Sequence, residues 1–346
     1  MSRKLASIRT VSDLRPIPGA DLIELAIVDG WQCVVKKGEF APGDRCVYFE
    51  IDSVLPIRPE YEFLRKACYR KAEWMPGGEG LRIKTVKLRG QISQGLALSV
   101  GSIGSLDAMA AANAVLEDGG NDITEALGVV LWDPPINANL RGKARGNFPS
   151  FIPKTDQERA QNCLRKLAES HGDHVFEATL KLDGSSCTIY AKDGFLGVCS
   201  RNLDLDMTQD GNAFVEMAKK VGDRVLSTGR NLAFQGELMG PGIQGNREGF
   251  TEHRWFVFDV WDIDAQCYWS SDERTPFVKA LGLDHVPVIQ ASVHAAMAPL
   301  DDLLAWSDDT PSITHPVAEG IVYKSLLDPS VSFKVIANRF LMGDAS

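Results

Sequence analysis

Short apolar runs separated by turn signals fill the first hundred residues and restrict what they can fold into. The segment from Ile23 to Ile51, IELAIVDGWQCVVKKGEFAPGDRCVYFEI, alternates apolar stretches with Asp-Gly, Lys-Gly and Pro-Gly pairs. This pattern is typical of strands joined by tight turns. About five such strands within roughly 100 residues favour a small barrel, and an OB-fold is the leading prediction. An SH3-like barrel fits the same pattern.

The composition changes after this region. SLDAMAAANAVLEDGGND indicates a short Ala-rich helix that ends at Gly119-Gly120, and DPPINANLRGKARGNFPSFIP is rich in Pro, Gly and Asn, as linkers are. In KTDQERAQNCLRKLAES, Thr155-Asp156 is followed by Glu158 as in a capping box, which predicts that a helix starts there.

Strand-like segments return beyond residue 175 and mix with two predicted helices, near 211–221 and 272–281, without a βαβ rhythm. An α+β fold is therefore favoured over a doubly wound one. We predict an OB-like barrel over residues 1–100, a linker with a short helix over 101–147, and a second domain over 148–346.

Charge is distributed unevenly along the chain. The 346 residues carry a net charge of −9, but residues 1–100 have 16 Lys and Arg against 12 Asp and Glu, a net charge of +4. A basic cluster within residues 65–89 contains Arg65, Lys66, Arg70, Lys71, Arg82, Lys84, Lys87 and Arg89. Such a cluster is either a solvated face or a surface that follows nucleic-acid phosphates.

Several functional classes find no support in the sequence. It contains no apolar run of 18 residues, no CxxC pair, no HExxH and no GxxxxGK[ST]. A membrane span, a dedicated zinc site and a P-loop are therefore not expected. The seven cysteines show no paired spacing and favour a reducing compartment, the cytoplasm.

The stretch TLKLDGSSCTIY places Lys181, Asp183 and Gly184 between two apolar segments. By itself it fits an Asp-Gly hairpin with a surface lysine. Further fragments follow in order along the chain: CSRN with Arg201, GELMGPGIQGN with Glu237, RWFVFDVWD with Phe256 and Phe258, EGIVYKS with Glu319 and Lys324, and VSFKVIAN with Lys334.

This ordered set resembles the motifs of the covalent nucleotidyltransferases, which include ATP-dependent DNA ligases, RNA ligases and mRNA-capping enzymes. The resemblance spans about residues 150–340 and implies an adenylyltransferase domain of antiparallel sheets and helices, an ATP-grasp-like ligase fold. It implies that Lys181 is the catalytic nucleophile toward ATP. A lysine amine attacks only when uncharged, and with a free pKa of about 10.4 it needs surroundings that favour proton loss.

The resemblance also implies roles for the other residues. Asp183, Glu237 and Glu319 would hold Mg²⁺ or Mn²⁺, with contacts through water. Glu237 would also contact the ribose, Arg201 would bind a phosphate, and Phe258 would stack on adenine, with Phe256 as the alternative. Lys324 and Lys334 would neutralise the α-phosphate. Candidates for orienting the pyrophosphate are Lys154 and Arg159.

The order of the domains narrows the resemblance. Only 12 residues follow Lys334, too few for the C-terminal barrel of DNA ligases, and the candidate barrel comes first. This order is similar to the Deinococcus-type RNA ligases (RNA ligase family 5). It implies an enzyme, expected to be a monomer, that joins an RNA 3′-OH to a 5′-phosphate at nicks through lysyl-AMP. A DNA ligase with rearranged domains, a capping guanylyltransferase and a non-catalytic nucleic-acid binder are the alternatives.

Overall fold

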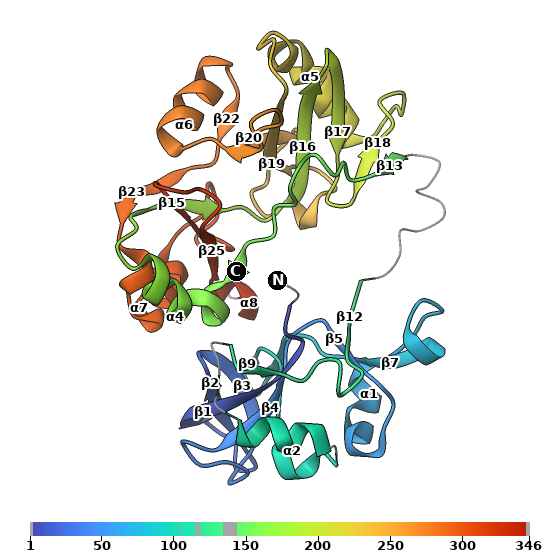
Figure 1. Ribbon diagram of the computed structural model, residues 1–346, viewed down its shortest axis with the longest axis vertical. Coiled ribbons are helices and arrows are strands. Elements are labelled where there is room, and N and C mark those ends of the chain that lie inside the picture. The colour runs from blue at the N-terminus through green and yellow to red at the C-terminus, as the bar shows by residue number, and fades with distance from the viewer. Residues whose placement is uncertain (1–2, 105, 115, 117–118, 134–143, 344–346) are drawn as a thin grey trace. The chain divides into compact units, whose positions relative to one another are not determined.

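The computed structural model describes residues 3–104, 106–114, 116, 119–133 and 144–343 (Figure 1). The chain divides into two compact units. Unit 1 comprises residues 1–135 and 161–167, and unit 2 comprises residues 136–160 and 168–346. Residues 134–143 of the predicted linker lie outside the described residues. Among the described residues, no helix combines the length and apolarity needed to cross a bilayer.

Unit 1 is built on a long first strand, β1, that hydrogen-bonds on both sides. Its sheet runs in the order β10-β4-β1-β2-β3, with β11 also pairing β1; a second sheet runs β12-β5-β7-β6, and β8 and β9 pair as a separate hairpin whose β9 contacts β3. The strands are β1 Ala6–Pro16, β2 Ile23–Val28, β3 Trp31–Lys36, β4 Arg45–Phe49, β5 Ser53–Leu55, β6 Tyr69–Lys71, β7 Glu79–Arg82, β8 Val86–Leu88, β9 Gln91–Ser93, β10 Leu96–Ser99, β11 Asn121–Asp122 and β12 Val130–Leu131.

The core of unit 1 comes from alternate residues of these strands. Ile8, Val47 and Phe49 pack in one buried cluster, and Trp31 and Tyr48 pack in another. Since neighbouring residues of a strand point to opposite faces, the apolar runs place side chains in both clusters. Short helices complete the unit: η1 Pro59–Leu64, α1 Arg65–Cys68, η2 Pro76–Gly78, η3 Val100–Ser102 and α2 Leu106–Asn113.

The predicted Ala-rich helix is shorter than expected. Helix α2 ends at Asn113 rather than at Gly119-Gly120. The chain joins the sheet soon afterwards, because Asn121 in β11 pairs with Ile8 in β1. Residues 115, 117 and 118 lie outside the described residues.

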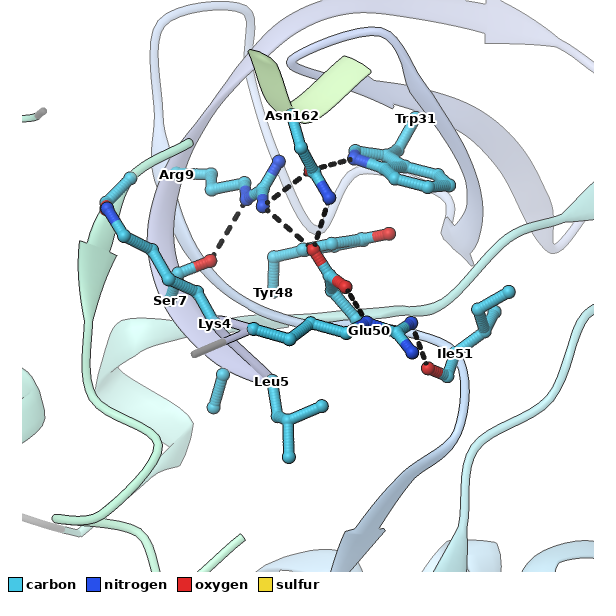
Figure 2. A network of polar contacts seen from close by, with 12 residues as sticks. Lys4, Leu5, Ser7, Arg9, Trp31, Tyr48, Glu50, Ile51 and Asn162 are labelled. Carbon is cyan, nitrogen blue, oxygen red and sulfur yellow. Dashed lines mark hydrogen bonds and ion pairs between the residues drawn. The ribbon is translucent and has the colours of Figure 1, made fainter. Parts of the chain in front are cut away.

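A buried polar network lies inside unit 1 (Figure 2). Glu50 accepts hydrogen bonds from Arg3 Nε at 2.6 Å, Arg9 Nη2 at 3.3 Å and Asn162 Nδ2 at 2.9 Å. Asn162 Oδ1 in turn accepts from Arg9 Nη2 at 3.1 Å and from the indole nitrogen of Trp31 at 3.2 Å. The side chains of Arg9 and Glu50 are 1% and 2% exposed, so these two charges compensate each other away from water.

Unit 2 contains two sheets. One runs β13-β18-β17-β16-β19-β20-β21 with β22 also pairing β20, and the other runs β14-β25-β24-β15-β23. The strands are β13 Ala144–Asn147, β14 Glu158–Arg159, β15 Phe176–Lys181, β16 Ser185–Lys192, β17 Phe195–Cys199, β18 Leu203–Leu205, β19 Leu232–Met239, β20 Arg254–Asp262, β21 Cys267–Tyr268, β22 Asp284–His285, β23 Val288–Val293, β24 Gly320–Ser325 and β25 Ser332–Ile336. This mixture of mainly antiparallel sheets and helices confirms the α+β prediction.

Helices cover these sheets. Helix α5 packs against β16 and β17, α6 contacts β20 and β22, and α7 contacts β24 and β25 (Figure 1). The predicted helices near 211–221 and 272–281 correspond to α5 and α6. The helices of the second half are α4 Ala160–His171, α5 Ala213–Leu226, η4 Gln244–Asn246, α6 Ser271–Ala280, η5 Ala295–Met297, α7 Leu300–Asp309 and α8 Asn338–Met342.

The predicted start of the helix at Thr155-Asp156 is wrong. Helix α4 begins at Ala160, and its N-cap residue Arg159 makes no side-chain capping bond. Glu158 and Arg159 instead form strand β14, which pairs in parallel with Phe333 and Lys334 of β25. Backbone pairing with a strand far along the chain therefore keeps Glu158 and Arg159 extended, although the local sequence predicted the first turn of a helix.

Candidate active site

A cavity of about 590 Å³ in unit 2 brings the predicted site residues together. It is lined by both sheets and by the segment before β14. The residues of the ordered motifs that line it are Lys181, Asp183, Arg201, Glu237, Phe258, Glu319, Lys324 and Lys334. Residues separated by more than 150 positions in the sequence thus share one site.

Lys181 ends strand β15 at the wall of this cavity. Its neighbours Leu180 and Leu182 are 5% and 3% exposed and anchor the backbone in the core. Lys181 Nζ forms an ion pair with Glu319 Oε2 at 2.6 Å. Because an ammonium group has no lone pair, this amine would have to lose a proton and leave the carboxylate to act as the predicted nucleophile.

Gly184 allows the strand that carries Lys181 to approach β19 closely. A Cβ atom at this position would lie 2.5 Å from the Leu238 carbonyl oxygen and 3.0 Å from Glu237 Cγ. The Gly184 amide donates a hydrogen bond to Glu237 Oε1 at 3.1 Å. The glycine after Asp183 is therefore required by packing, and the contact positions Glu237 beside the loop that follows Lys181.

Carboxylates are concentrated in the cavity. Burial raises the pKa of Glu237 to about 7, against attraction from Lys181, and the negative charge of Glu319 adds to the rise. Burial and then Glu319 likewise raise the pKa of Asp183. Such shifts indicate negative charges that a bound cation would stabilise. Among the described residues, no three His, Cys, Asp or Glu side chains are arranged to ligate a metal ion directly, so a metal at these carboxylates would be held through its water ligands.

A positive group faces these carboxylates. Lys334 lies on β25 next to Arg159 of β14, and both side chains line the cavity. Burial, together with the charges of Lys181 and Arg159, lowers the pKa of Lys334 to about 8. Like charges held together in this way suit a polyanion such as a triphosphate.

The two candidate aromatic residues have different positions. Strand β20 carries a bulge against β19, where Gln235 pairs with Asp259 and Gly236 pairs with Val257, so Phe258 is the extra residue. Phe258 lines the cavity, whereas Phe256 is 4% exposed and belongs to a buried cluster. The bulge thus presents Phe258, rather than Phe256, to a ligand.

Lys324 reaches the cavity wall from the interior. Its ammonium group lies 2.6 Å from Asp259 Oδ1 and donates to the Phe258 carbonyl oxygen at 2.8 Å. Burial lowers its pKa, while Asp259 opposes that effect. Lys324 therefore has fixed partners and a fixed position.

The basic residues at the mouth of the cavity are more exposed. Arg201 Nη2 pairs with Asp156 Oδ1 at 2.9 Å, and the two side chains are 70% and 61% exposed. Lys154 does not line the cavity, but its Nζ donates at 3.0 Å to Oδ1 of Asn202, which does. Of the two candidates for orienting pyrophosphate, Arg159 therefore lines the cavity and Lys154 contacts a residue of its lining.

Two residues of the GPGIQGNREGF loop were not predicted from the sequence. Gln244 lines the cavity with a backbone φ of 43°, a left-handed conformation that is uncommon outside glycine. The positive charge of Arg247 lowers the pKa of Asp183, against the larger effect of burial. The density of glycine around them was the available signal, because such loops bring the backbone close to a ligand.

Comparisons with known proteins match both units. An OB-fold domain model matches residues 5–100, and an RNA ligase model matches residues 174–336. A lysine-to-methionine mutant of Naegleria gruberi RNA ligase with AMP and Mn is 42% identical, with a TM-score of 0.82 and 99% of each chain covered. The chain belongs to the RNA ligase family.

Other structures of the Naegleria ligase agree with this assignment. A lysine-to-alanine mutant with ATP and Mn is 42% identical over 98% of this chain and 99% of that chain, with a TM-score of 0.82. The ligase with PPi is 42% identical over 99% of each chain, with a TM-score of 0.81. A comparison with curated proteins found no match. The predicted ATP-dependent RNA ligase with an N-terminal OB-fold domain is confirmed.

Proposed function

We propose that this RNA ligase works through a covalent lysyl-AMP intermediate on Lys181 and seals nicks whose 3′-OH strand is RNA. The observation that carries the proposal is the position of Lys181, which ends a buried strand at the wall of a cavity lined by carboxylates and by Lys334 and Arg159. We also assign the chain to the Deinococcus-type group, which the order of its two domains supports.

The first step is AMP transfer from ATP. The deprotonated Nζ of Lys181 attacks the α-phosphorus, the bond from that phosphorus to the bridging oxygen of the β-phosphate breaks, and pyrophosphate leaves. Lys334 and Arg159 neutralise the phosphates, and Phe258 stacks on the adenine. Lys324 lies at the same wall and stabilises charge at the α-phosphate. Arg201 leaves Asp156 to bind a phosphate.

A divalent metal, Mg²⁺ or Mn²⁺, is the second cofactor. Asp183, Glu237 and Glu319 share the cavity and would hold it through its water ligands, as Mg²⁺ commonly binds. When bound, the metal neutralises phosphate charge and favours the uncharged amine.

The next two steps build the phosphodiester bond. The AMP moves from Lys181 to the 5′-phosphate of the nucleic acid, and the 3′-OH of the adjacent strand then attacks that phosphate and expels AMP. A 2′-OH on the attacking nucleotide can hydrogen-bond or set a sugar shape that aligns the 3′-OH. We therefore propose faster sealing when the 3′ strand is RNA.

Unit 1 would hold the duplex through its basic cluster. Lys84, Lys87 and Arg89 lie on or beside the β8-β9 hairpin with exposed side chains. Replacing all three by Gln is expected to weaken duplex binding and reduce its salt dependence while lysyl-AMP still forms. A Lys36→Gln/Lys37→Gln variant serves as the control for charge removed elsewhere on unit 1. Unchanged binding in the triple variant would contradict this role.

Intact-mass spectrometry after incubation with ATP and Mg²⁺ tests the central proposal. The wild type should gain one AMP, which maps to Lys181, and Lys181→Arg should gain none because a guanidinium stays protonated. Lys181→Arg should still seal a nick whose 5′ end is already adenylylated, and Lys192→Arg should behave as the wild type. An adduct on another lysine would show that the nucleophile is wrongly assigned.

A sealing assay on nicks with RNA or DNA at the 3′ side tests the substrate. Equal rates on all-DNA nicks would favour a DNA ligase instead. We propose that the protein works in the cytoplasm as a monomer; the spacing of its seven cysteines, which suggests no disulfide framework, supports the reducing compartment.

A further inference from the structure

A group of buried charges lies behind the cavity wall and includes a residue that belongs to none of the motifs. Four side chains form it: Glu177 of β15, Asp259 of β20, Arg274 of α6 and Lys324 of β24. Their exposed fractions are 3%, 6%, 1% and 4%. Only Lys324 also lines the cavity. We call these four residues the buried charge group.

Arg274 is the centre of the buried charge group. Its Nη2 donates to Glu177 Oε2, its Nη1 lies 3.7 Å from Asp259 Oδ1, and its Nε donates to His285 Nε2 at 3.1 Å. Burial raises the pKa of Glu177, but Arg274 and a hydrogen bond from Ser271 outweigh it, so the pKa lies below its usual value. Glu177 is therefore an anion that Arg274 neutralises.

Arg274 also connects the two sheets of unit 2. Glu177 and Lys324 are register partners on β15 and β24 of one sheet, while Asp259 belongs to β20 of the other. Lys324 bonds across to Asp259 and to the Phe258 carbonyl oxygen. Lys324 thus has two carboxylates near it, Asp259 and Glu177, and the position of its ammonium group depends on which of the two it pairs with.

The charges of this group balance. Two carboxylates face two cations, which is the arrangement that makes burial of charges tolerable. Without Arg274, the Lys324 ammonium would stand between two carboxylates, and one negative charge would remain uncompensated beside a cavity that takes a polyanion. Charges interact strongly where water is excluded, so this excess would oppose the binding of phosphates.

We propose that Arg274 is a positioning residue for AMP transfer: by neutralising Glu177, it leaves Lys324 paired with Asp259 and Phe258 at the cavity wall. The role rests on the proposed function of the cavity, since it acts on the same reaction. Arg274 itself touches neither the cavity nor the nucleotide.

A set of charge variants tests this role. Arg274→Gln leaves the group with an excess negative charge, Glu177→Gln leaves an excess positive charge, and the double variant is neutral again. The measured quantity is kcat/KM for the exchange of labelled pyrophosphate into ATP, which turns over because lysyl-AMP formation is reversed by pyrophosphate, at several ATP concentrations, in the full-length protein.

The expected pattern follows the sign of the charge. Arg274→Gln should lower kcat/KM by about tenfold or more, chiefly through a higher KM for ATP. Glu177→Gln should not raise KM, and the double variant should recover most of the loss. Arg254→Gln is the matched control, because Arg254 forms an ion pair with Asp284 at 2.7 Å in which both side chains are exposed, at 40% and 49%. The kcat/KM of Arg254→Gln should equal that of the wild type.

Two results would overturn the proposal. One is a wild-type kcat/KM in Arg274→Gln. The other is an equal loss in all three variants, which would assign Arg274 a role in packing alone. If Arg274→Gln does not fold, the double variant decides: activity near the wild type supports the role, and a folded but inactive double variant refutes it. Failure of the proposed function itself would give a different result, because the wild type would then form no AMP adduct on Lys181.

Discussion

Replacing Glu50 by Gln should destabilise unit 1 far more than the removal of an exposed charge. Glu50 accepts from Arg9 and Asn162 through one carboxylate oxygen and from Arg3 through the other (Figure 2). A glutamine keeps the size of the side chain, but its NH₂ group would face one of these donors. Arg9 would also lose its buried counter-charge, since its side chain is 1% exposed.

The expected cost follows from these contacts. Removing one partner of a buried ion pair typically costs about 3–5 kcal/mol. For a domain of this size, each kcal/mol lowers the melting temperature by roughly 3–4 °C, so Glu50→Gln should melt about 9–20 °C lower. A single domain is stable by only about 5–15 kcal/mol, so the loss is a large fraction of the total.

Hydrogen exchange with mass spectrometry is the suitable assay, because the chain has two units that need not unfold together. Peptides covering β1 and β4 should exchange faster in Glu50→Gln, whereas peptides of β16 and β19 should not. Asp13→Asn is the control, since Asp13 pairs with Arg15 at the surface at 2.8 Å. A melting temperature of Glu50→Gln equal to that of Asp13→Asn would refute the reasoning.

Three further predictions concern the active site. Glu237 has a raised pKa of about 7, so the folded metal-free protein holds an extra proton between about pH 4.5 and 7. Its free energy of unfolding should fall by roughly 3 kcal/mol as pH rises through that window, and denaturant melts of Glu237→Gln should lack this part of the slope. Lys334, with a lowered pKa of about 8, should lose its charge above that pH. The ATP affinity of the wild type, measured by calorimetry, should therefore fall between about pH 7 and 9. The affinity of Lys334→Arg should stay constant over this range, because arginine stays charged. The same fall in Lys334→Arg would exclude Lys334 as its cause. Gly184→Ala should lower both the melting temperature and the rate of lysyl-AMP formation, because its Cβ would lie 2.5 Å from the Leu238 carbonyl oxygen; a wild-type melting temperature would show that β19 can move to accept it.

Much of the site could be predicted from the sequence because each functional side chain lies within or next to a locally encoded strand. The apolar neighbours of Lys181 predicted a buried strand, and alternation placed Lys181 and Asp183 on the same side of it. The order of the charged and aromatic residues along the chain then indicated one kind of chemistry. Apart from Phe256, these residues all line the cavity.

Contacts between segments that are far apart in the sequence could not be predicted from local patterns. The capping pattern at Thr155 predicted a helix, but pairing of β14 with β25 extends the chain there and delivers Arg159 to the cavity. The bulge in β20 selects Phe258 over Phe256, and periodicity alone places both on one face.

The sequence by itself determined the class of fold, because alternating apolar residues and turn residues act over a few positions, and its ordered motifs indicated the chemistry of an RNA ligase. Only the tertiary structure decided which groups surround Lys181. Arg274 and Glu177 are 97 positions apart and meet because two sheets and a helix pack together. Burial strengthens their interaction, and burial is a property of the whole packed unit rather than of any segment.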